Sequence, residues 1–331
     1  MNSSGKVLIL GASGGIGGEV ARRLVADNWQ VRALKRGAQI RDPEDGIQWI
    51  AGDALDGGQV AAAAAGCDVI VHAVNPPGYR HWRQQVLPML RNTLQAAERQ
   101  RALVVLPGTV YNYGPDAFPL IAEEAAQQPV TRKGAIRVAM ELALKDYVQR
   151  GGRALIVRAG DFFGPRAGNN WFSQGLVKPG QLPRIISYPG AIGVGHQWAW
   201  LPDVADTIAA LLARRHELEP FARFHMQGHW DSDGSEMSQA IQRVVARYGG
   251  RAVAKSFPWW LVKLAAPFNA TLREMVEMHY LWRLPVRLRN DKLVDFLGAE
   301  PHTPLDSAVY QTLQGLGCLP AGAINQEAGE A

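Results

Sequence analysis

A glycine-rich turn between an apolar strand and a helical pattern is the segment of this chain best suited to bind a ligand. It follows the apolar run at residues 7–10 directly. Gly11 permits a tight turn, Gly14 lets the backbone approach a pyrophosphate, and Gly17 lets the helix pack closely on the strand. The helix N-terminus adds unpaired N–H groups and the positive end of its dipole. The turn therefore predicts a dinucleotide-binding site built from Gly11, Ser13, Gly14, Gly15, Ile16 and Gly17.

The end of the second expected strand indicates which dinucleotide the turn would hold. Enzymes that select NAD usually carry an acidic residue there, which bonds both ribose hydroxyls. This chain has Lys35 and Arg36 instead, and two cations suit a 2′-phosphate. Asp42 and Glu44 come too late to serve as that acid. Two solvated surface cations are the alternative, but the missing acid favours NADP(H) over NAD.

The histidines are weaker candidates for chemistry. His72 lies inside an apolar run, where a satisfied core histidine is more common than a catalyst. His196 is expected in a loop over the substrate cleft, where it could touch a substrate. Two histidines and two aspartates in the segment 225–233 resemble metal ligands only superficially, so we predict no metal site.

Alternating strands and helices must position the turn. Continuous apolar strands are typical of a parallel sheet that is covered on both faces. The pattern predicts an α/β fold with a doubly wound parallel sheet, the Rossmann fold. Strands are expected at 7–10, 30–34, 47–50, 68–74, 102–106, 154–157 and 222–228, and helices from residue 16 and at 61–65, 82–100, 131–149, 201–212 and 235–248.

The regular alternation loosens after residue 165, which suggests two parts. Residues 1–165 would form the NAD(P)-binding domain. Residues 166–320 would form a smaller, mostly helical substrate lobe, interleaved with the last Rossmann elements at 201–214 and 222–228. The small and polar residues 321–331 are expected to form a flexible tail.

Composition narrows the class of partner. The 331 residues carry a formal charge of +5 from 35 basic and 30 acidic residues, and the basic residues are scattered, which disfavours nucleic acid. The apolar segment 257–268 is too short for stable membrane insertion, which needs about 20 apolar residues, so a buried or partner-facing helix is expected. Two distant cysteines suit a reducing cytoplasm. A small-molecule substrate and a homodimer are the expected partners.

With these motifs, the chain resembles the extended short-chain dehydrogenase/reductase superfamily, in particular the NAD-dependent epimerase/dehydratase family, over about residues 5–215. The glycine turn matches the family's GxxGxxG motif, and Trp200–Ala205 resembles a later helix start. The resemblance implies further cofactor contacts in three segments. They are Asp53 and Ala54 at the adenine, Ala73, Val74 and Asn75 under the cofactor, and Ala159, Asp161 and Phe162 in a loop against the nicotinamide.

One departure from the family bears directly on catalysis. The family places a Ser or Thr after the fifth strand and a Tyr-x-x-x-Lys pair on the next long helix. Thr109 stands at the Ser/Thr position, but no tyrosine occurs between Tyr113 and Tyr147. When Glu141 is aligned with the family's usual glutamate, the pair becomes Lys133 and Arg137.

The resemblance implies roles for these replacements. Thr109 would hold the substrate oxygen and also contact the cofactor, and Arg137 would donate to the ribose hydroxyls. Arg137 cannot shuttle a proton near neutral pH, whereas Lys133 could if burial and Arg137 lower its pKa. A simple cationic contact to the substrate is the alternative for Lys133. Tyr111, in the neighbouring loop, is a substitute acid or a packed aromatic residue.

The expected function is NADP(H)-dependent hydride transfer to or from a small carbonyl or alcohol substrate. A nucleotide-sugar epimerase or dehydratase is the first alternative, although those reactions rely on the absent tyrosine. The second alternative is a non-catalytic NADP(H)-binding sensor or partner protein, because loss of the tyrosine beside intact cofactor residues fits that interpretation.

Overall fold

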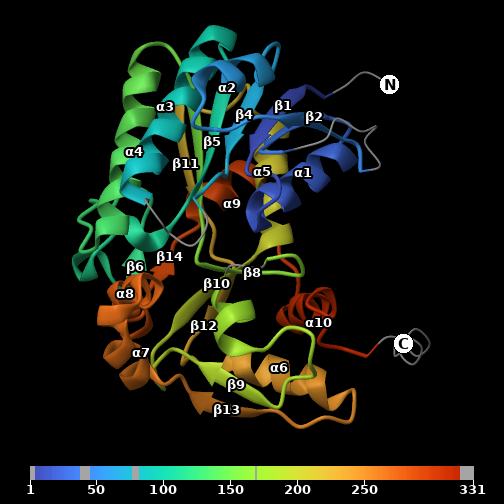
Figure 1. The fold of residues 1–331 in the computed structure, drawn as a ribbon, viewed down its shortest axis with the longest axis vertical. Helices are drawn as coiled ribbons and strands as arrows, with labels where there is room; N and C mark the ends of the chain where they lie inside the picture. Colours follow the sequence, from blue (N-terminus) through green and yellow to red (C-terminus); the bar gives the residue numbers. More distant parts are fainter. Residues whose placement is uncertain (1–3, 38–44, 77–81, 168–169, 321–331) are drawn as a thin grey trace.

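A seven-stranded parallel sheet forms the centre of the computed structural model, in the order β11-β7-β5-β4-β1-β2-β3 (Figure 1). This order confirms the predicted doubly wound sheet. The structure describes residues 4–37, 45–76, 82–167 and 170–320, so the expected tail at 321–331 lies outside the described residues. The strands are β1 (Lys6–Leu10), β2 (Gln30–Lys35), β3 (Ile47–Ala51), β4 (Val69–His72), β5 (Leu103–Gly108), β7 (Arg153–Arg158) and β11 (Phe221–His225).

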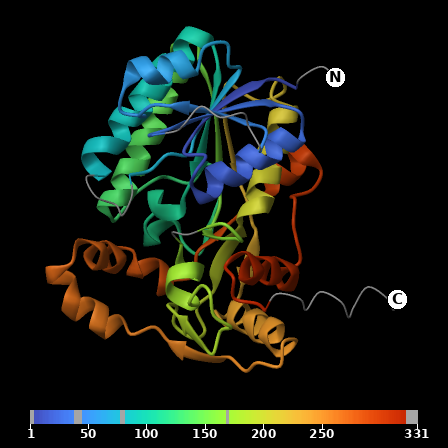
Figure 2. The same ribbon diagram turned by 45° about the vertical axis from the view of Figure 1, so that its right-hand side comes forward.

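Helices cover both faces of this sheet (Figures 1 and 2). On one face lie α1 (Gly15–Ala26), α5 (Leu201–Ala213) and α9 (Asp291–Leu297), and on the other α2 (Gly57–Ala63), α3 (Trp82–Gln100) and α4 (Arg132–Gln149). In β1, Val7 and Ile9 join the first core, whereas Leu8 and Leu10 join the second. Neighbouring strand residues point to opposite faces, so a strand buried on both must be apolar throughout.

A second layer of short strands and helices continues from the carboxyl edge of the sheet, because β7 and β11 lead directly into it (Figure 2). The sequence predicts a mostly helical lobe. Its strands are too short to show the alternation of apolar and polar side chains by which a strand is recognised in a sequence. Its three-stranded sheet contains β8 (Asp161–Phe163), β10 (His196–Trp200) and β12 (His229–Asp231), and its strand pairs are β9 (Ile185–Tyr188) with β13 (Val253–Ser256) and β6 (Leu120–Ile121) with β14 (Arg287–Leu288).

The remaining helices complete this lobe and bring the C-terminal part of the chain back over the sheet edge. Buried Met278, Leu281 and Val286 pack against Val110 and Tyr113, which follow β5. Among the described helices, none is long and apolar enough to cross a membrane. The helices are α6 (Glu236–Ala246), α7 (Trp259–Ala265), α8 (Ala270–Glu277) and α10 (Leu305–Gly315), with single turns at Val110–Asn112, Pro115–Ala117, Phe172–Leu176, Ala266–Phe268 and His279–Trp282.

Buried His72 makes the stability of the fold depend on pH. Its Nδ1 lies 2.8 Å from Oγ1 of Thr93, which itself donates to the backbone of Met89. Burial, and next the charge of Arg137, lowers the pKa of His72 from 6.5 to about 3. Between these values the unfolded chain binds a proton that the folded chain does not. The stability from His72 is therefore complete above pH 6.5 and is lost as the pH falls toward 3.

We expect His72→Gln to flatten the dependence of the unfolding free energy on pH. One such histidine contributes a slope of about 1.4 kcal/mol per pH unit between the two pKa values. Urea denaturation at a series of pH values between 7 and 4 measures this slope, and His216→Gln, at an exposed histidine, is the control. A slope in His72→Gln equal to that of the wild type would contradict the prediction.

Candidate functional site

The glycine turn after β1 leaves one side open. Gly11 has a φ of +94°, and a Cβ added there would lie 2.5 Å from the backbone oxygen of Ala73. A Cβ on Gly17 would clash with the backbone oxygen of Gly11. A Cβ on Gly14, in contrast, would meet only that oxygen, at 3.3 Å. Gly11 and Gly17 therefore permit the turn and the packing, whereas the described residues leave the space beside Gly14 open to a ligand.

The N-terminus of α1 fits a pyrophosphate. Gly14 is the N-cap of this helix and supplies no side-chain hydrogen bond, and the first turn holds no acidic residue. Ser13 and Gly14 are exposed, and Gly15 and Ile16 are half-buried. Helix N–H groups without partners and a positive dipole end favour an anion at this position. The residues present thus suit the phosphates of a dinucleotide.

The other residues expected at the cofactor lie along the same edge of the sheet. Ala73, Val74 and Asn75 follow β4, and the N–H of Ala73 donates to Leu10 at the end of β1 over 2.9 Å. The segment 159–162 follows β7 at the same edge. Because the strands are parallel, their carboxyl ends meet there, where ligands bind in doubly wound folds.

Lys35 and Arg36 are exposed at the end of β2. The ammonium of Lys35 lies 5.5 Å from the ring centroid of Trp49, and Arg36 extends from the following turn. Asp42 and Glu44 lie outside the described residues. On the neighbouring loop, Asp53 is half-buried and accepts a hydrogen bond from the N–H of Leu55, and Ala54 is buried. Lys35 and Arg36 are therefore open to solvent at the carboxyl end of β2, the strand next to β1 in the sheet.

Thr109 brings a hydroxyl to the same edge of the sheet. It follows β5 directly, and its Oγ1 is buried with no hydrogen-bond partner among the described residues. A buried hydroxyl without a partner is costly, so the site is suited to a ligand oxygen at this position. Tyr111, in the next turn, is half-buried and packs against the apolar cluster of the lobe.

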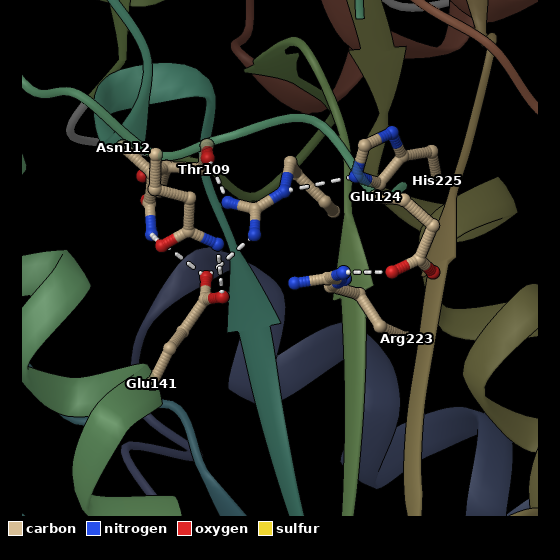
Figure 3. A network of polar contacts seen from close by, with 8 residues as sticks. Thr109, Asn112, Glu124, Glu141, Arg223 and His225 are labelled. Atoms are coloured by element: carbon tan, nitrogen blue, oxygen red, sulfur yellow. Dashed lines mark hydrogen bonds and ion pairs between the residues drawn. The ribbon is translucent and has the colours of Figure 1, made fainter. Parts of the chain in front are cut away.

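A buried polar network holds the loop that carries Thr109 (Figure 3). Arg158, at the end of β7, is fully buried and donates to the backbone oxygen of Thr109. Its Nη2 lies 2.5 Å from Oε1 of Glu141, and its Nε donates to Nε2 of His225 over 3.1 Å. Asn112 also donates to Glu141, over 2.8 Å. No spacing motif connects Arg158 with Glu141, and a single sequence cannot show that their side chains meet.

Lys133 and Arg137 both face inward from α4, as their four-residue spacing predicts. Lys133 is 5% exposed, and its Nζ lies 3.2 Å from Oε2 of Glu274 on α8. Burial lowers the pKa of Lys133, and the charges of Glu274 and Glu277 oppose that shift. The guanidinium of Arg137 lies 5.3 Å from the ring centroid of Trp82. Lys133 thus has a carboxylate partner that the sequence pattern did not predict.

His196 lies in a strand rather than in the expected loop. It is the first residue of β10 and is 5% exposed, and its Nε2 lies 2.9 Å from Oδ2 of Asp161. Aromatic residues at 196–200 give no clear alternation, which is why this strand was not predicted. His196 and Asp161 line a small cavity of about 10 Å³ between the sheet edge and the lobe.

The segment 225–233 does not gather its own histidines and aspartates into a cluster. The donor atoms of His229 instead lie within 4.8 Å of those of Asp203 and His302, a geometry that could hold a metal ion. Both oxygens of Asp203 already accept hydrogen bonds from Thr303, each over 2.8 Å. We therefore assign Asp203 a role in fastening the segment around residue 303 to the start of α5.

The family model for the NAD dependent epimerase/dehydratase family matches residues 7–223, more than half of the chain. The chain therefore belongs to this family. A curated relative, uncharacterized protein y4nL of Sinorhizobium fredii (strain NBRC 101917 / NGR234), is 28% identical over 206 residues, which make up 55% of this chain and 57% of that protein. The chain thus matches little more than half the length of that relative.

Solved structures of similar fold include nucleotide-sugar enzymes. A UDP-glucose 4-epimerase has a TM-score of 0.72 at 13% identity, with 94% of this chain and 97% of that chain covered. The UDP-glucuronic acid 4-epimerase of Bacillus cereus, in complex with UDP-glucuronic acid and NAD, has a TM-score of 0.70 at 14% identity, with 94% and 98% covered. MoeE5, in complex with UDP-glucose and NAD, has a TM-score of 0.69 at 19% identity, with the same coverage. At these sequence identities, the similarity to the solved structures is evidence for the fold alone.

Proposed function

We propose that this protein is an NADP(H)-dependent oxidoreductase that transfers a hydride to or from a small carbonyl or alcohol substrate. One observation carries the proposal: the open turn at Gly14 lies at the same edge of the sheet as the hydroxyl of Thr109, which has no hydrogen-bond partner among the described residues. When bound, the dinucleotide supplies or accepts the hydride. Residues 1–165 would hold it, and residues 166–320 would shape the substrate site.

The roles of the chain's own residues follow from their contacts. Thr109 would hold the substrate oxygen through its unpartnered hydroxyl. Arg137 would donate to the ribose, and Lys133, beside Glu274, would contact the polar end of the substrate. Tyr111 is an alternative residue for donating a proton to the substrate. We also propose that the protein is cytoplasmic and that it forms a homodimer.

Arg36→Ala tests the choice of NADP(H). Loss of a charge-assisted hydrogen bond to the 2′-phosphate should weaken NADPH binding by about 1.5–3 kcal/mol. Binding of NADH, which lacks that phosphate, should stay nearly unchanged. Titrations of the wild type and the variant with both dinucleotides measure the difference, and Arg247→Ala, at an exposed arginine in the lobe, is the control. Equal affinity of the wild type for the two dinucleotides would refute the preference.

A panel of small aldehydes, ketones and UDP-sugars, followed by NADPH absorbance and by product analysis, tests the reaction. Turnover of a carbonyl compound supports the oxidoreductase. Conversion of a UDP-sugar favours the epimerase or dehydratase alternative, which is motivated by the UDP-sugar complexes of similar fold. NADPH binding without turnover favours a sensor, for which the exposed Trp260, Leu264 and Phe268 of the lobe offer an apolar contact surface.

A further inference from the structure

We propose that His196 and Asp161 form the acid–base pair of this site and supply the proton for which the family uses its absent tyrosine. The inference rests on the proposed oxidoreductase function and deepens it by naming the proton carrier. It also narrows the substrate class to small, uncharged aldehydes and ketones, because the cavity beside the pair is lined by Val110, Leu281 and Val286 together with Gly160 and the uncharged Gln197.

The structure holds the two side chains in a fixed arrangement. Asp161 begins β8 and His196 begins β10, and these strands pair in parallel. Nε2 of His196 lies 2.9 Å from Oδ2 of Asp161, so the two are hydrogen-bonded. The imidazole also stacks on Trp282, with ring centroids 3.8 Å apart and an interplanar angle of 11°. An imidazole held by a carboxylate and an aromatic face keeps one orientation, as acid–base catalysis requires.

The hydrogen bond decides which nitrogen can exchange a proton with a ligand. An ionised carboxylate only accepts, so Nε2 of His196 must carry the hydrogen that is shared with Asp161. Nδ1 is then the exchangeable position. It is buried and has no hydrogen-bond partner among the described residues. In serine hydrolases a carboxylate likewise fixes the tautomer of a histidine and leaves the other nitrogen for chemistry.

The pair stands at the edge of the sheet where the hydride transfer would occur. The cavity that it lines is also bordered by Val110 and Gly160. Val110 follows Thr109, and Gly160 lies in the loop after β7 that the family places against the nicotinamide. With about 10 Å³, the cavity holds about one water molecule, so its walls at Leu281 and Val286 must move to admit a substrate.

The proton step balances for reduction of a carbonyl compound. As the carbonyl carbon receives the hydride, the electron pair of its C=O bond moves onto the oxygen. Protonated His196 gives the proton on Nδ1 to that oxygen, and the alcohol forms. The imidazole is left neutral, still bonded to Asp161, and regains a proton from solvent. In alcohol oxidation the same nitrogen accepts the hydroxyl proton.

Lys133 is less suited to this role. Its ammonium is paired with Glu274 at 3.2 Å, and the same Nζ donates to the backbone oxygen of that residue over 3.4 Å. A lysine fixed in this way is a positioning cation, so Lys133→Met should affect substrate affinity more than turnover.

Two measurements test the pair. In the first, His196→Gln and Asp161→Asn are assayed with a substrate found in the carbonyl panel. Turnover should fall by about 10²-fold or more in His196→Gln, the usual effect of losing a positioned acid or base. NADPH affinity and melting temperature of His196→Gln should stay close to those of the wild type. His229→Gln, at another buried histidine of the same three-stranded sheet, is the control.

The second measurement needs no turnover. Nitrogen-15 NMR of the free protein, with the His196 signals assigned by their loss in His196→Gln, should show the Nε2–H tautomer in the neutral form, and Asp161→Asn should abolish that preference. Two outcomes would overturn the acid–base pair but leave the proposed function standing. One is turnover of a carbonyl substrate by His196→Gln at the wild-type rate, and the other is a neutral His196 that carries its hydrogen on Nδ1. Failure of every carbonyl compound in the panel overturns the proposed function and the pair with it.

Discussion

Arg158→Met is expected to destabilise the protein by about 3–5 kcal/mol, because it leaves the carboxylate of Glu141 buried without its ion partner. The side chains of Arg158 and Glu141 are 0% and 4% exposed, so water cannot replace the lost contact. The variant also removes the hydrogen bonds to Thr109 and His225. Urea denaturation measures the loss of unfolding free energy.

A neighbouring ion pair provides the matched control. Arg223, on the adjacent strand β11, lies 3.0 Å from Glu124, whose side chain is 80% exposed (Figure 3). Arg223→Met should therefore cost at most about 1 kcal/mol. The double variant Arg158→Met/Glu141→Gln should recover part of the lost stability, since no buried charge then lacks a partner. Equal losses in Arg158→Met and Arg223→Met would contradict the account of the network.

Gly14→Val and Gly17→Val should separate ligand binding from folding. The Cβ of a valine at Gly14 meets only the oxygen of Gly11 among the described residues, and the branched side chain would occupy the space where the pyrophosphate is expected to approach. We expect a loss of NADPH affinity of about 100-fold or more with the melting temperature nearly retained. A valine at Gly17 clashes with the backbone of Gly11, so it should lower the melting temperature strongly.

Calorimetric titration and thermal melting of both variants check this contrast. If Gly14→Val bound NADPH as strongly as the wild type, the glycines would serve only the turn. If Gly17→Val melted like the wild type, the helix would pack on the strand less closely than the structure indicates.

The sheet and its turn were predictable because their signals are local. Residues 7–10 are buried on both faces and must be apolar throughout, and the turn requires glycine at Gly11, where φ is positive. The predicted helix at 82–100 coincides with α3, and that at 131–149 differs from α4 by one residue. Such elements follow from periodicity and turn chemistry within a short window of sequence.

The candidate site was predictable only in part, because its partners are distant in sequence. Glu274 meets Lys133 from a helix more than a hundred residues later, and no spacing rule connects them. The pairing of His196 with Asp161 depends on two short strands in the lobe, where aromatic and glycine residues obscure the period. Motifs therefore indicated the candidate cofactor edge, whereas the proposed acid–base pair can be recognised only in the three-dimensional arrangement.

A crystal structure of the protein grown with NADPH tests the central claim most directly. The account predicts the pyrophosphate on the N–H groups at Gly14, Gly15 and Ile16, the 2′-phosphate beside Arg36, and the nicotinamide at the edge that carries Thr109 and the His196–Asp161 pair. Density for the dinucleotide away from the glycine turn, or a nicotinamide directed away from Thr109, would contradict it.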